Sequence, residues 1–109
     1  MLHIKQFDNQ TQEIISNISH LFDKYEIDEV YIFGSRARGD HKESSDIDLV
    51  YRRNKQFGIF HELNAINFKE ELQKAIPSDA VNYNEVINNH NNKVAQNAKK
   101  EMILIYEKD

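Results

Sequence analysis

The stretch VYIFGSRARGDHKESSDIDLV, residues Val30–Val50, is the most informative part of this 109-residue chain. Apolar and β-branched residues predict a strand over Ile27–Phe33, which Gly34 ends. Ser35–Arg38 can form one helical turn, and the polar residues after it predict a loop. A second strand is expected over Asp46–Tyr51, because acidic and apolar residues alternate there. The stretch therefore predicts two strands joined by a helical turn and a polar loop.

Four residues of this stretch are suited to binding a polyphosphate and a metal ion. Asp46 and Asp48 lie on the predicted strand with Ile47 between them, so the two carboxylates share a face while Ile47 points into the core. Such carboxylates repel each other unless a cation lies between them, and Mg²⁺ prefers oxygen ligands. Gly34 lets the backbone approach a bulky anion, and Ser35 offers a hydroxyl at a turn whose N–H groups attract phosphate. The pattern predicts a pocket for a triphosphate with magnesium.

Each of these positions also has a simpler interpretation. Asp46 and Asp48 could be solvent-facing acids on an edge strand, and the glycine–serine pair could be an ordinary strand-to-helix turn. Arg36 and Arg38 could neutralise the charge of a bound substrate or simply be solvated. Ser45 could hydrogen-bond a metal-binding aspartate or cap the loop. The residues alone leave these alternatives open.

The rest of the chain predicts helices that alternate with strands. An amphipathic helix over Asn9–Tyr25 has apolar residues at steps of three and four, with Thr11 as its expected N-cap. The remaining expected elements are a helix over Phe57–Ile76, a strand over Asp79–Tyr83, a helical segment within Glu85–Lys100 and a strand over Met102–Tyr106. This order favours a small α+β (α/β) domain in which helices pack on one face of a mixed sheet.

The composition excludes several classes of protein. Hydrophobic residues make up 39% and charged residues 29%, and no stretch approaches the roughly 20 consecutive apolar residues of a membrane span or resembles a signal peptide. The absence of cysteine excludes thiol chemistry, and the five histidines lack the spacing of zinc ligands. A net charge of -4 disfavours direct nucleic-acid binding. We expect one cytoplasmic domain over residues 1–109 that does not bind membranes.

The run Val30–Val50 closely resembles the nucleotidyltransferases of the DNA polymerase β superfamily, and within them the small minimal nucleotidyltransferase (MNT) proteins. The resemblance implies a fold like the polymerase β palm, in which Gly34 and Ser35 would bind the phosphates of a nucleoside triphosphate. It also implies that Asp46 and Asp48 would hold two Mg²⁺ ions.

The resemblance further implies a third carboxylate on a neighbouring strand, and by position this is Asp79. The residues around Asp79 depart from the family's apolar pattern, because Ser78 precedes it and Ala80 and Asn82 follow it. Glu85 is therefore the alternative for the third acid. If Asp79 does not face the other two acids, the fold and nucleotide binding could survive with little or no transfer activity.

Proteins that resemble this chain are often made beside a helical HEPN-domain ribonuclease and act as its antitoxin. Some of them transfer AMP from ATP to a tyrosine of that toxin, so the resemblance implies ATP as substrate and a hetero-oligomer with a HEPN toxin. Any of Phe57, Phe60 and Phe68 that does not fit inside the core would mark the partner surface. Two alternatives remain: neutralisation of the toxin by contact alone, and transfer to a small molecule such as an aminoglycoside, for which a homodimer could build the pocket.

Overall fold

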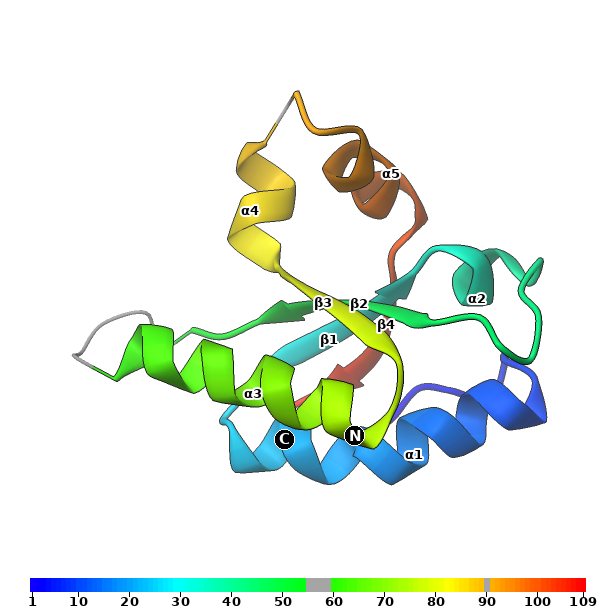
Figure 1. Cartoon of the computed structure of the whole chain (residues 1–109), viewed down its shortest axis with the longest axis horizontal. Coiled ribbons are helices and arrows are strands. Elements are labelled where there is room, and N and C mark those ends of the chain that lie inside the picture. The colour runs from blue at the N-terminus through cyan, green and yellow to red at the C-terminus, as the bar shows by residue number, and fades with distance from the viewer. Residues whose placement is uncertain (55–59, 90) are drawn as a thin grey trace.

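The centre of the protein is a mixed four-stranded sheet with strand order β3-β2-β1-β4 (Figure 1). The computed structural model describes residues 1–54, 60–89 and 91–109. β1 is antiparallel to both of its neighbours, whereas β3 is parallel to β2. The expected α+β class is confirmed. The strands are β1 (Glu29–Phe33), β2 (Ile47–Arg52), β3 (Ser78–Asn82) and β4 (Ile103–Glu107).

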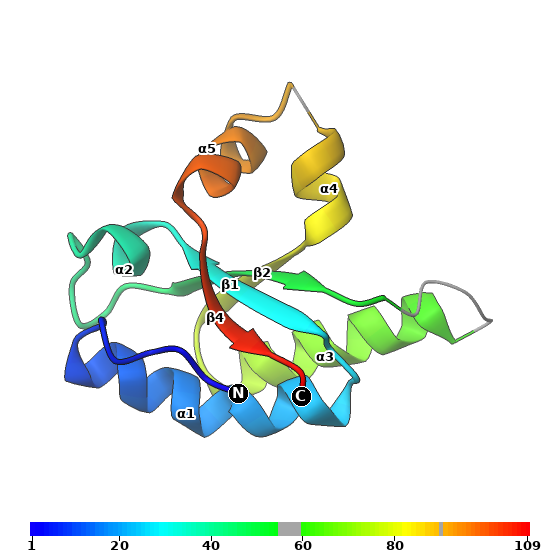
Figure 2. The same cartoon turned by 180° about the vertical axis from the view of Figure 1, so that it is seen from behind.

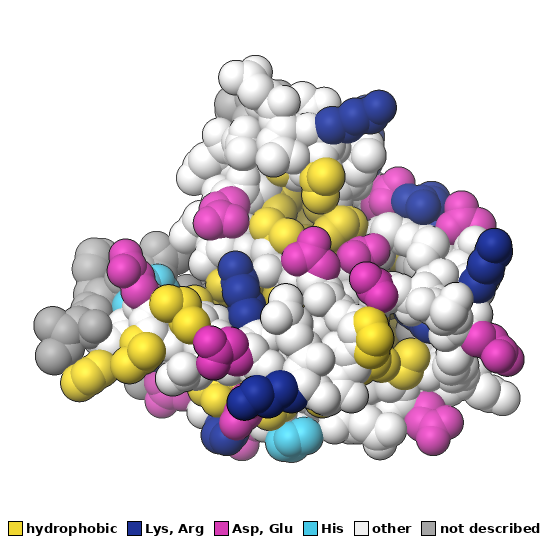
Figure 3. Space-filling model, in the orientation of Figure 1, with side chains coloured by type: hydrophobic (Ala, Val, Ile, Leu, Met, Phe, Trp, Pro, Cys, Tyr) yellow, Lys and Arg dark blue, Asp and Glu magenta, His cyan; other side chains and the backbone are white. Residues whose placement is uncertain are grey.

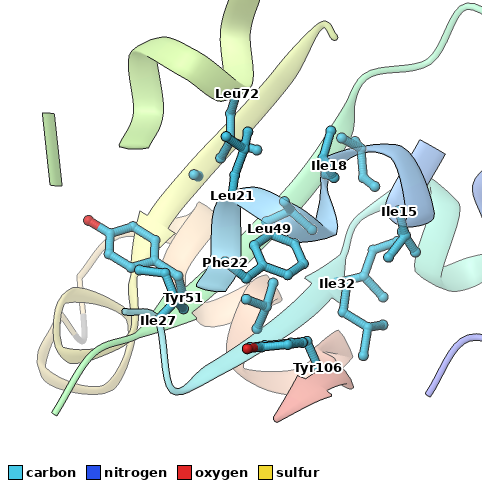
Figure 4. Close-up of a cluster of buried hydrophobic side chains, with 14 of the residues drawn as sticks. Ile15, Ile18, Leu21, Phe22, Ile27, Ile32, Leu49, Tyr51, Leu72 and Tyr106 are labelled. Atoms are coloured by element: carbon cyan, nitrogen blue, oxygen red, sulfur yellow. The ribbon is translucent and has the colours of Figure 1, made fainter. Parts of the chain in front are cut away.

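The two long helices, α1 (Asn9–Lys24) and α3 (His61–Ala75), cover one face of the sheet, as Figures 1 and 2 show. Their apolar residues meet the inward side chains of the strands in the main core, drawn in Figure 4. Fully buried members of this core include Ile15, Phe22, Ile32, Leu49, Phe68 and Leu72. The expected start of the second helix at Phe57 lies outside the described residues. Within them, no helix is both long enough and apolar enough to cross a bilayer.

Two short helices, α4 (Tyr83–Asn88) and α5 (Lys93–Glu101), pack on the opposite face of the sheet. They bury a second, smaller cluster made of Phe33, Val50, Val86 and Ala98. The expectation that helices pack on one face therefore holds for α1 and α3 and is corrected for α4 and α5. The asparagine-rich segment also forms two helices in place of one, because the side chains of Asn82 and Asn92 cap separate helix starts.

The predicted cap of α1 is wrong. Asp8 is the N-cap, and its carboxylate accepts a hydrogen bond of 3.2 Å from the backbone N–H of Thr11. Thr11 lies inside the helix, fully buried, and its hydroxyl accepts a hydrogen bond from Arg36. Both residues are good caps by type, and the position of the first helical turn decides between them.

One end of the sheet gathers residues that are far apart in the sequence. β1 ends where the other three strands begin, because Phe33 pairs with Asp48, Asp48 pairs with Asp79, and Ile32 pairs with Ile103. The turn after β1, the acids of β2 and β3 and the residues before β4 therefore meet at this end.

Candidate active site

Three aspartates lie at this end of the sheet. Asp48 and Asp79 are directly paired in the parallel ladder between β2 and β3, so both side chains project from the same face. This is the face of Val50 and the two short helices. Asp46 precedes β2 and is exposed, while Ile47 between the two acids is fully buried, as expected. Figure 3 shows acidic side chains gathered near the middle of the view, below the two short helices.

The half-buried carboxyl of Asp48 carries negative charge that its surroundings do not fully compensate. Its burial raises the pKa of Asp48, and the charges of Asp79, Asp46 and Glu101 raise it further. The guanidinium of Arg38 acts in the opposite direction but does not reverse the shift. The site is therefore one at which a cation would lower the electrostatic energy.

Gly34 brings the turn after β1 directly against Asp48. Its φ of 76° lies in the region that favours glycine, and it precedes the single-turn helix α2 (Ser35–Arg38). A Cβ added at Gly34 would overlap the Oδ2 atom of Asp48 and lie 3.2 Å from its Cγ. The sequence needs glycine here for two independent reasons, the backbone conformation and the space that the aspartate occupies.

Gly34→Ala is expected to lower the free energy of unfolding by about 1–3 kcal/mol and to displace the Asp48 carboxylate. Gly39→Ala is the control for a positive φ alone, since Gly39 is left-handed helical with a φ of 86° and has nothing within 4 Å of an added Cβ. Thermal unfolding of both variants measures the cost of the strained backbone. The extra cost at Gly34 measures the contact with Asp48 together with a backbone conformation, ψ -156° against 8° at Gly39, that residues other than glycine rarely adopt, and equal costs would contradict both.

Arg36, an expected substrate-binding residue, lies in the interior instead. Its side chain is only 2% exposed. The guanidinium donates to the side chains of Gln10 and Thr11 and to the backbone carbonyls of Glu43 and Ser45, at 2.9–3.2 Å. These bonds join α1 to the loop that leads into β2. Arg36 thus holds the loop before Asp46, and none of its nitrogen atoms is left for a phosphate.

The structure gives Ser45 and Glu85, two further candidates, no contact with the three aspartates among the hydrogen bonds of the described residues. The hydroxyl of Ser45 accepts a 2.8 Å hydrogen bond from the backbone N–H of Lys42, which is the loop-capping geometry. Glu85 is exposed on α4, whereas Asp79 pairs with Asp48 in the parallel ladder and its charge raises the pKa of Asp48. The geometry therefore favours Asp79 over Glu85 as the third acid.

Glu101 is the residue at this site that the sequence reasoning missed. Its carboxylate accepts a 3.2 Å hydrogen bond from the Gly34 N–H. Nη1 of Arg38 donates to both oxygens of the same carboxylate, at 2.9 Å each. Arg38 also pairs with Asp40. The available signal was topological, since a final strand that pairs with β1 in antiparallel fashion must begin beside the end of β1.

Comparison with known protein families identifies the family of this chain. Residues 16–109 match the model of the family described as polymerase beta, nucleotidyltransferase. The chain belongs to this nucleotidyltransferase family. No curated protein was found to match it.

Solved structures with the same fold include toxin–antitoxin complexes. A toxin–antitoxin structure with AMP-PNP has a TM-score of 0.60 and 16% identity, over 94% of this chain and 76% of that chain. A structure of the tri-AMPylated HEPN toxin of Shewanella oneidensis with its MNT antitoxin has a TM-score of 0.58 and 14% identity, over 89% and 72% of the two chains. At these identities the likeness shows the fold.

The donor set at this end of the sheet fits Mg²⁺. Within residues 1–54, 60–89 and 91–109, no three acidic or histidine side chains converge closely enough to form a preformed metal cage. Mg²⁺ does not require one, because it is usually held by one or two carboxylates together with water and substrate phosphates. The aspartate pair beside the Gly34 turn supplies such carboxylates, and the uncompensated charge on Asp48 favours a cation there.

Asp48→Asn is expected to raise the unfolding midpoint at neutral pH by about 2–5 °C. The folded protein raises the pKa of Asp48, so the ionised carboxylate costs folding free energy at any pH above that raised value. As the pH falls below it, the carboxyl takes up a proton in the folded state and the cost shrinks, until it is gone below the ordinary pKa of an aspartate. Thermal unfolding at several pH values should show the gap between variant and wild type shrinking with acidification; a gap that is constant would contradict this electrostatic origin.

Proposed function

We propose that this chain is a Mg²⁺-dependent nucleotidyltransferase that transfers AMP from ATP to a hydroxyl of a protein partner, a tyrosine of a HEPN toxin, and so acts as its antitoxin. The observation that carries the proposal is the close approach of the Gly34 turn to Asp48, with Asp79 beside Asp48 in the ladder. A backbone turn with donors for phosphate and a carboxylate pair that can hold a cation are the two parts that nucleotidyl transfer from a triphosphate needs.

Each residue at the site has a proposed role. The backbone at Gly34 and the hydroxyl of Ser35 would bind the terminal phosphates, and Arg38 would neutralise part of their charge. Asp46 and Asp48, with Asp79, would hold Mg²⁺, which offsets the charge of the triphosphate and of departing pyrophosphate when bound.

Asp79 would also accept the proton of the attacking hydroxyl, because it lies on the neighbouring strand beside Asp48. The acceptor oxygen then forms its bond to the α-phosphorus while the bond to the bridging oxygen breaks. AMP is transferred to the acceptor, and pyrophosphate leaves.

An exposed apolar stripe at the start of α3, which includes its N-cap residue, supports a protein as the acceptor. Phe60, Leu63 and Ile66 recur at steps of three and are 68%, 50% and 53% exposed. Of the phenylalanines considered from the sequence, Phe68 is fully buried and Phe60 is the surplus one, while Phe57 lies outside the described residues. Apolar side chains arranged in this way are typical of surfaces that bind another protein.

The transfer is tested with ATP labelled at the α-phosphate, Mg²⁺, this chain and the protein encoded in the neighbouring reading frame. We expect label on a tyrosine of the partner and release of pyrophosphate, and no label when the γ-phosphate carries it instead. Label from the γ-phosphate would indicate phosphorylation rather than nucleotidyl transfer. An unlabelled partner in a reaction with folded, complex-forming protein would refute the proposal.

A further inference from the structure

The carboxylate of Glu101 occupies the donors of the Gly34 turn. Glu101 is the last residue of α5, and its side chain is 25% exposed. It accepts hydrogen bonds from the Gly34 N–H at 3.2 Å and from Arg38 at 2.9 Å. A backbone N–H together with a guanidinium is the donor set that binds one edge of a phosphate group, and a carboxylate uses it in the same way.

Glu101 and a bound polyphosphate would compete for this position. Both are anions that need the same N–H and guanidinium donors, and a hydrogen already donated to Glu101 is not available to a phosphate oxygen. The neighbouring carboxylate of Asp48 adds further repulsion between anions crowded at this end of the sheet.

We propose that Glu101 is an internal competitor that closes the phosphate turn of the free protein and has to withdraw before a nucleoside triphosphate binds. The inference rests on the proposed function and adds the regulation of the same site. Only the side chain needs to move. The backbone is held by α5 before Glu101 and by β4 after it. The Met102 N–H donates to the Ala98 carbonyl at 2.8 Å, and β4 begins at Ile103.

The opposite role makes the opposite prediction. If Glu101 were a fourth carboxylate that helps to hold a cation, removing its charge would weaken the binding of a magnesium–polyphosphate complex. If it is a competitor, removing the charge frees the Gly34 and Arg38 donors and strengthens that binding. The sign of the change therefore separates the two roles.

The test compares Glu101→Gln with wild type by calorimetric titration of magnesium tripolyphosphate and of magnesium ATP. Glutamine keeps the shape of the side chain and removes its charge. We expect the apparent affinity of the variant to be about fivefold higher, since the fraction of protein with an open turn limits the wild-type affinity. Glu70→Gln, an equal change of charge on the exposed surface of α3, should leave the affinity unchanged.

The amide resonance of Gly34 gives a readout that does not depend on activity. In the wild type it should move when magnesium tripolyphosphate is added, from its Glu101-bonded position towards the position seen in the bound Glu101→Gln variant. Affinity of Glu101→Gln equal to or lower than that of Glu70→Gln would overturn the inference.

The same titrations separate the inference from the proposed function. Tighter binding by Glu101→Gln without AMP transfer to a partner would leave the competitor role standing and overturn the transferase. A complete absence of polyphosphate binding by every folded variant would overturn both.

Discussion

The double variant Asp46→Asn/Asp48→Asn is expected to transfer AMP at least about a thousandfold more slowly than the wild type. Neutralising both carboxylates removes the charges that would hold a cation beside the Gly34 turn, and with them about 4 kcal/mol of transition-state stabilisation. Initial rates of labelling of the partner from α-labelled ATP measure the effect. Residual transfer above about a tenth of the wild-type rate would contradict the assignment of the aspartates.

The loss should occur without unfolding. Asp46 is exposed and Asp48 is half-buried among like charges, so their replacement by asparagine relieves repulsion and leaves the buried Ile47 between them in place. Circular dichroism and thermal unfolding check this. Asp23→Asn is a suitable control, because Asp23 is an exposed acid near the end of α1, on the other face of the sheet.

The same variant decides between an enzymatic antitoxin and one that acts by contact. If AMP transfer neutralises the toxin, cells that produce the double variant with the toxin should stop growing. If contact is sufficient, the variant should still protect them although the toxin carries no AMP. Co-purification of the variant with the toxin shows whether the complex itself has survived.

Arg36→Ala is expected to lower the free energy of unfolding by about 3 kcal/mol or more. The truncation leaves a cavity, and it deprives four buried or half-buried acceptors of a charged donor. Arg36→Lys should recover only part of this free energy of unfolding, because a single ammonium group cannot reproduce the planar fork of the guanidinium. Denaturation by urea measures the free energy of unfolding of the two variants.

Arg38→Ala is the matched control, two residues further along the same short helix. The Arg38 side chain is 47% exposed and its ion pairs with Asp40 and Glu101 lie at the surface, so we expect a loss below about 1 kcal/mol. Equal losses from Arg36→Ala and Arg38→Ala would contradict a structural role for Arg36. A large loss at Arg36 alone supports its role in holding the loop before Asp46.

Much of the candidate site could be predicted from the sequence because it depends on the conformation of short segments, each set by neighbouring residues. The alternation that buries Ile47 and leaves Asp46 and Asp48 on the other face depends only on the period of a strand. The need for glycine at position 34 follows from a turn between a strand and a helix. The amphipathic helices follow from apolar spacing, although the change of cap from Thr11 to Asp8 shows that helix ends are less certain.

The tertiary structure alone decided which residues from distant segments meet. Arg36 and Arg38 belong to one four-residue helix and are the same residue type, yet contacts with α1 and the loop bury the first and leave the second exposed. Asp79 reaches Asp48 through the register of two parallel strands, and Glu101 reaches Gly34 through the pairing of β4 with β1. Local sequence sets the periodicity of each strand, but register depends on how whole faces pack across the sheet, which no single segment encodes.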